Sequence, residues 1–390
     1  MTKRMDNYLV VGAGFSGAVV ARELVEHGEH ARVCVIDRRD HVAGHCETRR
    51  DPATGVMVHH YGPHIFNTNN EGVWNYVNRF GLFRPFVNRV KAVTPKGMYG
   101  LPINLLTINQ FFGKTFSPAE ARAFLATLGD ATIREPVNFE EQALKMLGRD
   151  LYENFFYGYT VKQWGCEPRD LPASILKRLP IRFNYDDSYY DKKFQGIPQQ
   201  GYTDVVRLIL DHPRIETMLN TDFRTLDRAA YARTFYTGPL DEYFACRLGR
   251  LGYRTVTFER IDAEGDYQGN AVINYTSADV PFTRIHEHKH FAPWESLEKT
   301  VAFREFSKET GPGDEPYYPK RLASDKQLLL SYRELASAER GVTFLGRLAT
   351  YRYMDMETVI GEALDYATKW FPALSLDSSK ALPVFPNTEN

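Results

Sequence analysis

The sequence predicts a multi-domain α/β fold, because three regions of the chain differ in character. A glycine-rich turn lies between two strand patterns at the start, residues 103–180 follow a helical pattern, and residues 181–199 and 250–291 have strand-type composition. At 390 residues the chain is long for one core, so two or three domains are expected.

The glycine-rich turn follows four residues of strand type and precedes a helical pattern. Gly12, Gly14 and Gly17 form G-x-G-x-x-G, which permits a tight turn, close approach of a pyrophosphate and close helix–strand packing. The helix amino end attracts phosphate. A second strand ends at Asp37, which suits a ribose hydroxyl better than a 2′-phosphate. These features predict a Rossmann-type dinucleotide-binding domain. Arg38 and Gly44, soon after the acid, would extend the phosphate site, as is seen in flavin-binding proteins.

The helical region contains recognisable helix starts. Ser117-Pro-Ala-Glu120 is a capping box with proline at the first helical position, and Asn138 caps a second helix. A third helix would contain Phe155 and Phe156. Helices grouped without intervening strands predict an inserted helical domain.

The remaining regions complete the predicted order of elements. Residues 181–199 and 250–291 are expected to form an antiparallel sheet, and a strand near 234–239 to return to the first sheet, after a helix at 202–210. Residues from Val342 onward predict a strand, a turn and a helix. The Pro/Ser-rich residues from Ala373 predict a loosely held tail.

Composition and charge narrow the class of protein. The net charge of −1 provides no basic field for nucleic acid or an anionic membrane. Four cysteines without C-x-x-C spacing indicate reduced thiols in a cytosolic protein. The sequence shows no signal-peptide pattern and no apolar run of membrane-spanning length. We therefore expect a soluble, cytoplasmic protein.

Two groups of histidines raise the question of a metal site: His59, His60 and His64, and the alternating His286, His288 and His290. The alternating group would share one face of a strand. Neither group has zincin spacing or a cysteine pair, so we expect no metal.

Hydrolytic chemistry has no visible machinery, because the sequence lacks G-x-S-x-G and a distinctive carboxylate pair. Aromatic and arginine side chains recur instead, at residues 155–164 and at Arg178, Tyr189, Arg284, Tyr318 and Tyr353. Aromatic faces stack on a base or sugar, and arginines fork onto phosphates. The set predicts a pocket for a nucleotide diphosphate.

Ten motifs carry a family resemblance that covers residues 8–370. They are GAGFSG (12–17), YGPHIF (61–66), GYTVKQW (158–164), LPASILKR (171–178), FQGIP (194–198), GNAVINYT (269–276), FTRI (282–285), EHKHF (287–291), EPYYP (315–319) and GRLATYRY (346–353). On these motifs the chain resembles the UDP-galactopyranose mutases, flavoenzymes that interconvert UDP-galactopyranose and UDP-galactofuranose.

The resemblance implies how the domains are divided. A discontinuous Rossmann-like FAD-binding domain would comprise residues 1–86, 200–245 and 318–372. A helical domain at 103–180 would include a mobile loop near 167–180, and a twisted antiparallel β-sheet domain would comprise 87–102, 181–199 and 246–317. Residues 373–390 would be the tail.

The resemblance also implies an isomerase that uses reduced FAD without net redox change. Flavin N5 would attack the anomeric carbon as UDP leaves, and the sugar would reclose as a furanose after a ring-opened iminium. The product would supply galactofuranose for cell-surface glycans in cell wall biosynthesis. The protein would be a homodimer, and NAD(P)H or another flavin-reducing system would serve as reductant.

Matching positions imply the site residues. Arg178 and Arg284 would clamp the diphosphate and His64 would lie beside the isoalloxazine, which makes these three the implied catalytic residues. Further substrate contacts would come from Asn88, Phe155, Phe156, Tyr159, Thr160, Trp164, Tyr189, Asn274, Tyr318 and Tyr353. FAD would be held by Gly12, Gly14, Phe15, Ser16, Gly17, Asp37, Arg38, Gly44, His45, His64, Ile65, Phe223, Gly238, Arg347, Tyr353, Asp355 and Met356.

Two positions depart from the family pattern, and three other classes stay open. The chain has Ala43-Gly44-His45 where many members have Gly-Gly-Asn, and Asn67 where many have a second histidine. Both positions concern flavin placement. The alternatives are an FAD-dependent oxidase or desaturase, a non-catalytic flavin or sugar-nucleotide binding protein, and a plain NAD dehydrogenase, because a fold alone does not fix function.

Overall fold

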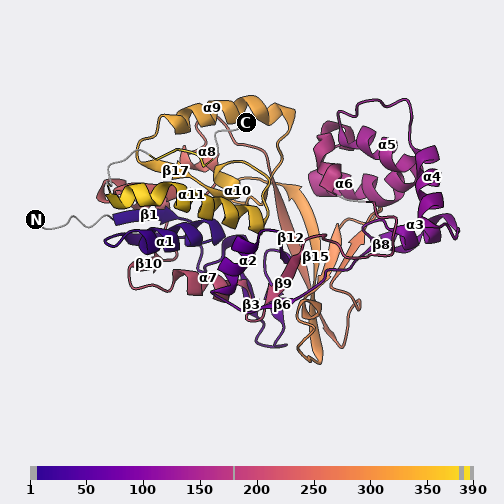
Figure 1. The fold of residues 1–390 in the computed structure, drawn as a ribbon, viewed down its shortest axis with the longest axis horizontal. Helices are drawn as coiled ribbons and strands as arrows, with labels where there is room; N and C mark the ends of the chain where they lie inside the picture. Colours follow the sequence, from indigo (N-terminus) through magenta and orange to yellow (C-terminus); the bar gives the residue numbers. More distant parts are fainter. Residues whose placement is uncertain (1–6, 179–180, 377–381, 387–390) are drawn as a thin grey trace, which may run out of the picture.

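The computed structural model describes residues 7–178, 181–376 and 382–386. Figure 1 shows a parallel sheet covered by helices on one side of the molecule and a separate group of helices on the other, with long antiparallel strands between them. The multi-domain α/β class that the sequence predicts is confirmed.

The first strand lies at the centre of a five-stranded parallel sheet. The strand order is β10 (Ile215–Met218), β2 (Arg32–Ile36), β1 (Asn7–Val11), β11 (Arg233–Tyr236) and β17 (Val342–Phe344). Tyr8 and Val10 pack against α1 (Phe15–His27), α7 (Tyr202–Leu210) and α11 (Met356–Leu376), whereas Leu9 and Val11 pack against α8 (Leu240–Tyr243) and α9 (Ala323–Ser337). Both faces are therefore buried, as is usual for parallel sheets. The predicted returning strand is β11, which pairs with β1 in parallel.

The second sheet has seven strands and is mostly antiparallel. Its order is β16 (Tyr318–Pro319), β12 (Tyr253–Glu264), β15 (Lys299–Glu309), β14 (Arg284–Glu287), β13 (Val272–Tyr275), β7 (Val90–Thr94) and β8 (Gly97–Leu101). Only β13 and β7 run parallel to each other among these neighbours. The long strands β12 and β15 join the two ends of the molecule in Figure 1.

Residues 181–199 do not join this sheet, so that prediction is wrong. Residues 181–193 contain no strand. Instead, β9 (Phe194–Pro198) pairs with β5 (Phe66–Thr68) and β6 (Phe83–Pro85) in a separate three-stranded antiparallel sheet. Composition indicates a strand but does not identify its partner. A short hairpin of β3 (Thr48–Arg50) and β4 (Met57–His59), and the helix α2 (Glu71–Asn78), lie nearby in sequence.

The helical region contains α3 (Leu105–Phe112), α4 (Pro118–Leu128), α5 (Phe139–Leu151) and α6 (Gly158–Trp164). The capping box at Ser117 and the cap at Asn138 are confirmed, since their side chains accept the backbone N–H of Glu120 and Glu141. The expected third helix begins as a π-helical turn, Tyr152–Tyr157, before α6 continues it. Such turns are frequent at functional sites.

Two segments of the predicted tail are described, and both are more ordered than predicted. Helix α11 continues to Leu376, past the expected start of the tail. The Val384 carbonyl oxygen accepts the N–H of Phe344 at 2.7 Å, and the Phe385 ring lies 5.5 Å from the Phe344 ring. Residues 382–386 are therefore packed against β17. Among the helices of the described ranges, none combines the length and the apolar character that crossing a bilayer requires.

Candidate active site

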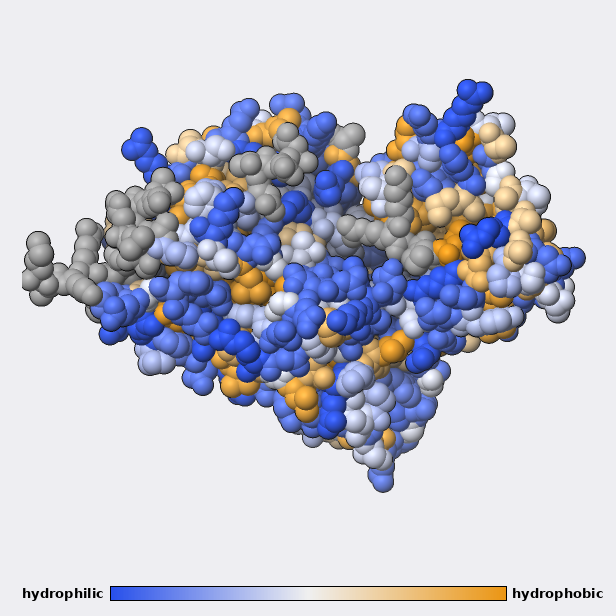
Figure 2. All heavy atoms as spheres, in the orientation of Figure 1, coloured by the Kyte–Doolittle hydropathy of each residue, from blue (hydrophilic) through white to orange (hydrophobic). Residues whose placement is uncertain are grey.

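A cavity of about 1460 Å³, here called the main cavity, lies at the carboxyl ends of β1, β2 and β11 and reaches the seven-stranded sheet. The parallel sheet reverses its order at β1, and doubly wound sheets bind ligands at such a point. In Figure 2 the surface is notched between the part that carries α9 and the part that carries α4 and α5.

Most of the residues expected at the site line this cavity. The residues expected at the cofactor all do so except Gly17. The substrate set contributes Tyr159, Trp164, Tyr189, Arg284, Tyr318 and Tyr353. Phe155, Phe156 and Asn274 line a smaller neighbouring cavity, here called the side cavity, and Asn88 and Thr160 are buried without lining either. The side chain of Arg178 lies outside the described part of the structure.

The three glycines of the β1–α1 turn meet different surroundings. A Cβ on Gly12, whose φ is +105°, would lie 2.1 Å from Thr237 Oγ1, and one on Gly17 would lie 1.9 Å from the Gly12 carbonyl oxygen. On Gly14 the nearest atom, Gly44 Cα, would be 3.9 Å away. No side chain caps α1 at Gly14, so its first N–H groups are available to an anion. The turn is therefore tight on the protein side and open towards the cavity, which fits a dinucleotide pyrophosphate.

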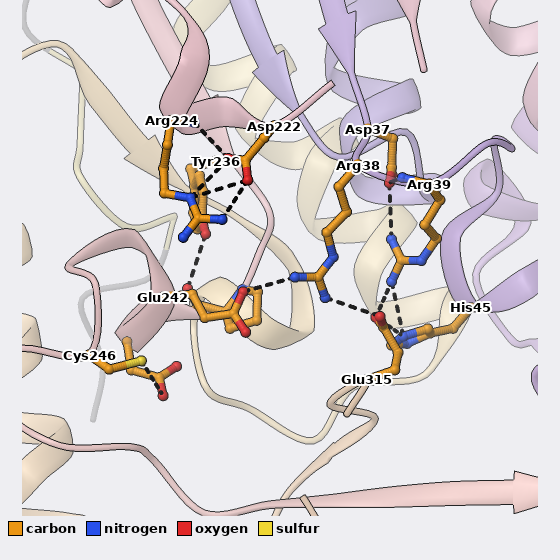
Figure 3. A network of polar contacts seen from close by, with 12 residues as sticks. Asp37, Arg38, Arg39, His45, Asp222, Arg224, Tyr236, Glu242, Cys246 and Glu315 are labelled. Atoms are coloured by element: carbon orange, nitrogen blue, oxygen red, sulfur yellow. Dashed lines mark hydrogen bonds and ion pairs between the residues drawn. The ribbon is translucent and has the colours of Figure 1, made fainter. Parts of the chain in front are cut away.

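Asp37 anchors a polar network at this end of the cavity (Figure 3). It accepts the backbone N–H of Ala13 at 2.9 Å and lies 3.2 Å from an Arg39 guanidinium nitrogen. Arg38 pairs with Glu242 and with Glu315, both at 3.0 Å. Arg39 also pairs with Glu315.

Glu315 ties a distant loop to this network. It lies between β15 and β16, three residues before Tyr318, and His45 Nε2 is 3.0 Å from its carboxylate. Burial acts to raise the pKa of Glu315, but His45 and Arg39 lower it to about 2. Burial lowers the pKa of His45 to about 4, so the imidazole is neutral at pH 7. Its Nδ1 lies 3.1 Å from Arg347 Nη2. The departure at His45 thus places a buried polar contact in the lining.

Asn274, Arg284 and Glu305 form a row across the seven-stranded sheet. They are cross-strand neighbours on β13, β14 and β15, so their side chains share a face. Arg284 Nη2 lies 2.9 Å from Glu305 Oε2, and the Glu305 side chain is only 1% exposed. Burial opposes the charge of Arg284, but Glu305 raises its pKa well above the ordinary value. Arg284 is therefore a fixed cation on the main cavity.

Aromatic rings continue the wall beside Arg284. Tyr318 and Tyr353 stack with ring centroids 5.8 Å apart, and the Arg347 guanidinium lies 5.2 Å from the Tyr318 ring. His64 lines the same cavity, and its Nδ1 lies 2.9 Å from the Gly62 carbonyl oxygen. Burial and the charge of Arg347 lower the pKa of His64 to about 3, so it is a neutral hydrogen-bonding group.

The alternating histidines do not share one face of a strand, contrary to expectation. Strand β14 ends at Glu287, and His288 and His290 lie in the 3₁₀ turn that follows. In the described part of the chain, Asp266, Glu287 and His290 bring three potential ligand atoms within 4.8 Å. Lys289 Nζ already lies 2.6 Å from Asp266, and Glu287 accepts three consecutive backbone N–H groups.

Sequence reasoning missed the acids behind the arginines. Arg39 and Glu315 are far apart in sequence, and Glu305 is one acid among 49. Period-2 burial in the strands could have placed Glu305 on the same face as Arg284, because side chains alternate along a strand. Glu315 begins the EPYYP motif, but nothing in that motif indicates that Arg38, Arg39 and His45 are its partners.

Comparison with known proteins places these features in a family. A family model described as UDP-galactopyranose mutase matches residues 154–353, and one described as an NAD(P)-binding Rossmann-like domain matches residues 10–80. A probable UDP-galactopyranose mutase of Klebsiella pneumoniae is 54% identical over 97% of this chain and 98% of its own. The chain belongs to the UDP-galactopyranose mutase family.

Two further comparisons bear on fold and substrate. A dTDP-fucopyranose mutase of Escherichia coli is 49% identical over 93% of this chain and 98% of its own. A crystal structure of a reduced UDP-galactopyranose mutase has a TM-score of 0.71 and 15% identity, covering 96% of this chain and 95% of that one, and so shares the fold. Family membership confirms the prediction of an isomerase of the UDP-galactopyranose mutase class over the three alternative classes.

Proposed function

We propose that the chain interconverts UDP-galactopyranose and UDP-galactofuranose with reduced FAD as cofactor. The observation that carries the proposal is that Arg284 and the glycine turn of β1–α1 face one cavity of about 1460 Å³. A pocket for one ligand usually measures about 300–1,000 Å³. The main cavity is large enough for a dinucleotide and a sugar nucleotide side by side.

The described residues fit FAD at one end of this cavity. The open side of Gly14 and the amino end of α1 suit the pyrophosphate, and Asp37 suits the ribose hydroxyls. His64, Ile65 and Arg347 would face the flavin. When bound, reduced FAD would supply a nucleophilic nitrogen, N5, at the anomeric carbon of the sugar.

The protein's own contribution is to bind and to stabilise charge. Arg284 is held in place by Glu305 before substrate arrives, so its guanidinium can stabilise the negative charge that develops on the departing diphosphate. Tyr318 and Tyr353 would exclude water from the sugar and place hydroxyl groups near the phosphates. We propose the same diphosphate role for Arg178, on the resemblance alone.

Several further features belong to the proposal. They are a homodimer, NAD(P)H or a related flavin-reducing system as reductant, a cytoplasmic location, the supply of galactofuranose for cell-surface glycans, and the domain boundaries given above apart from residues 181–199, which lie outside the seven-stranded sheet. The Escherichia coli relative suggests a second candidate reaction, which is the interconversion of dTDP-fucopyranose and its furanose form.

The test is to incubate the purified flavoprotein separately with UDP-galactofuranose and with dTDP-fucofuranose, with and without dithionite. The products are separated by chromatography. Conversion to UDP-galactopyranose only when the flavin is reduced supports the proposal. Conversion of dTDP-fucofuranose alone would support the second candidate. Oxygen consumption without isomerisation would refute both.

A further inference from the structure

We propose that the base subsite of this enzyme accepts thymine as well as uracil, with the 5-methyl group in the side cavity. The inference rests on the proposed function and adds to it the class of nucleobase. It makes dTDP-linked sugars ligands of the same site that binds UDP-linked sugars.

The side cavity is small and mostly apolar. Its volume is about 60 Å³, and it is lined by aliphatic and aromatic side chains from β8, α5, the π-helical turn and the segment after α6, including Leu101, Met146, Leu147 and Phe155. A water-sized group takes about 10–15 Å³ of such volume, so roughly four to six fit. Apolar walls of this kind favour a hydrocarbon group over water.

The side cavity lies beside the position expected for a nucleotide. Tyr159 and Tyr189 line both cavities, so the two lie next to each other. Asn274, which lines the side cavity, lies directly across from Arg284 on the neighbouring strand. A nucleoside diphosphate held by Arg284 would have its base within reach of Asn274, one strand across the sheet.

Asn274 offers a contact that uracil and thymine share. The residue is 8% exposed, and its Oδ1 is buried without a hydrogen-bond partner. Both bases carry an imide N–H at position 3, which can donate to this oxygen. Leaving a buried acceptor unpaired is costly, so an imide base is favoured at this position. Phe155, Phe156 and Tyr159 provide ring faces for the base to stack on.

The two bases differ only at carbon 5, where thymine carries a methyl group. A polar or filled wall would reject that methyl group, whereas an apolar wall with free volume gains from burying it. Burial of one such group strengthens binding by up to about fourfold. The walls contributed by Met146 and Leu147 are of the second kind.

Titration calorimetry of the flavin-bound protein with UDP, dUDP and dTDP isolates each difference. UDP and dUDP differ in the 2′-hydroxyl, and dUDP and dTDP differ in the 5-methyl group. We expect dTDP to bind as tightly as dUDP or up to about fourfold tighter. Binding of dTDP ten or more times weaker than dUDP, with UDP bound, would overturn this inference and leave the proposed function standing. Failure of UDP itself to bind would overturn both.

A pair of variants locates the methyl group. Met146→Phe fills the side cavity, whereas Leu144→Phe makes a comparable change on the same helix at a position that does not line it. Both side chains are partly buried. We expect Met146→Phe to weaken dTDP relative to dUDP by about tenfold, through steric overlap, and Leu144→Phe to leave the ratio unchanged. An unchanged ratio in Met146→Phe would show that the methyl group lies elsewhere.

Discussion

Neutralising Glu305 should destabilise the protein and make its stability depend more strongly on bound UDP than that of the wild type. The Glu305→Gln change keeps the side-chain volume but removes the only carboxylate within 2.9 Å of Arg284 among the described ion pairs. Glu305 Oε1 also accepts from Thr283 Oγ1 at 3.2 Å, and Oε2 lies 3.4 Å from His286 Nε2. All of these groups would face a neutral amide.

The size of the effect follows from the burial of the pair. Removing one partner of a buried ion pair costs about 3–5 kcal/mol. Arg284 is 25% exposed and reaches the main cavity, so solvent recovers part of the loss and the lower end, about 3 kcal/mol, is expected. For domains of 150–250 residues each kcal/mol shifts the melting temperature by roughly 2–4 °C. The variant should therefore melt roughly 6–12 °C lower.

Thermal unfolding followed by circular dichroism, with and without UDP, measures the effect. UDP should restore more stability to the variant than to the wild type, because the diphosphate becomes the main anion at Arg284. The control is Glu259→Gln, an exposed acid in the same sheet that lies 3.5 Å from Arg304 and should cost less than about 1 kcal/mol. Melting of Glu305→Gln as high as the control, or equal UDP effects in both, would refute the reasoning.

Four further substitutions test other parts of the structure. Gly14→Ala should fold, since its Cβ would meet no atom closer than 3.9 Å, but it should bind little flavin, because we propose that the pyrophosphate lies against this glycine. Gly17→Ala should fail to fold, because its Cβ would lie 1.9 Å from a backbone oxygen. Circular dichroism and flavin absorbance distinguish the two outcomes, and full flavin content in Gly14→Ala would contradict the prediction. Lys162→Met should speed amide hydrogen exchange in residues 275–282 by about tenfold or more, because the Lys162 ammonium donates to four carbonyl oxygens there at 2.7–2.9 Å. Unchanged protection would show that Lys162 does not hold this segment in place. Glu315 should stabilise the fold above its ordinary pKa of 4.5 and lose this contribution as the pH falls towards its folded pKa of about 2. The difference in melting temperature between wild type and Glu315→Gln should therefore shrink from about pH 6 to about pH 3, and a constant difference would show that the acid is not held ionised.

Local signals in the sequence predicted the elements that short-range physics determines. The β1–α1–β2 unit ending at Asp37 and the capping box at Ser117 depend on residues within a few turns of each other, and both formed as expected. The aromatic and arginine set also placed many residues around one cavity, because family motifs preserve positions whose partners are distant.

The errors arose where an element depends on a distant partner. Residues 181–199 have strand-type composition, yet only β9 forms, and its partners are β5 and β6. The segment 382–386 packs against β17 through apolar contacts that a Pro/Ser-rich composition does not reveal. The acids Glu305 and Glu315 act through tertiary pairing with arginines. Alternation along a strand could have indicated the face on which Glu305 lies, but not which arginine it pairs with.

Glu305 and Glu315 fix the positions of the arginines, so nucleotide preference can change within this fold while the cations stay in place. Glu305 fixes Arg284 from behind, and Glu315 fixes Arg38 and Arg39, so the cations at both ends of the main cavity are positioned by the protein before any ligand binds. The side cavity has no such constraint, because its lining is apolar and its volume can change by one side chain at a time. On the proposals above, substitution in the side cavity would change the preference for the base or its 5-methyl group without moving the cations, whereas substitution at Glu305 would disturb the proposed diphosphate contact for every nucleotide. Changes of nucleotide preference among such isomerases should therefore arise first in the wall formed by α5 and β8.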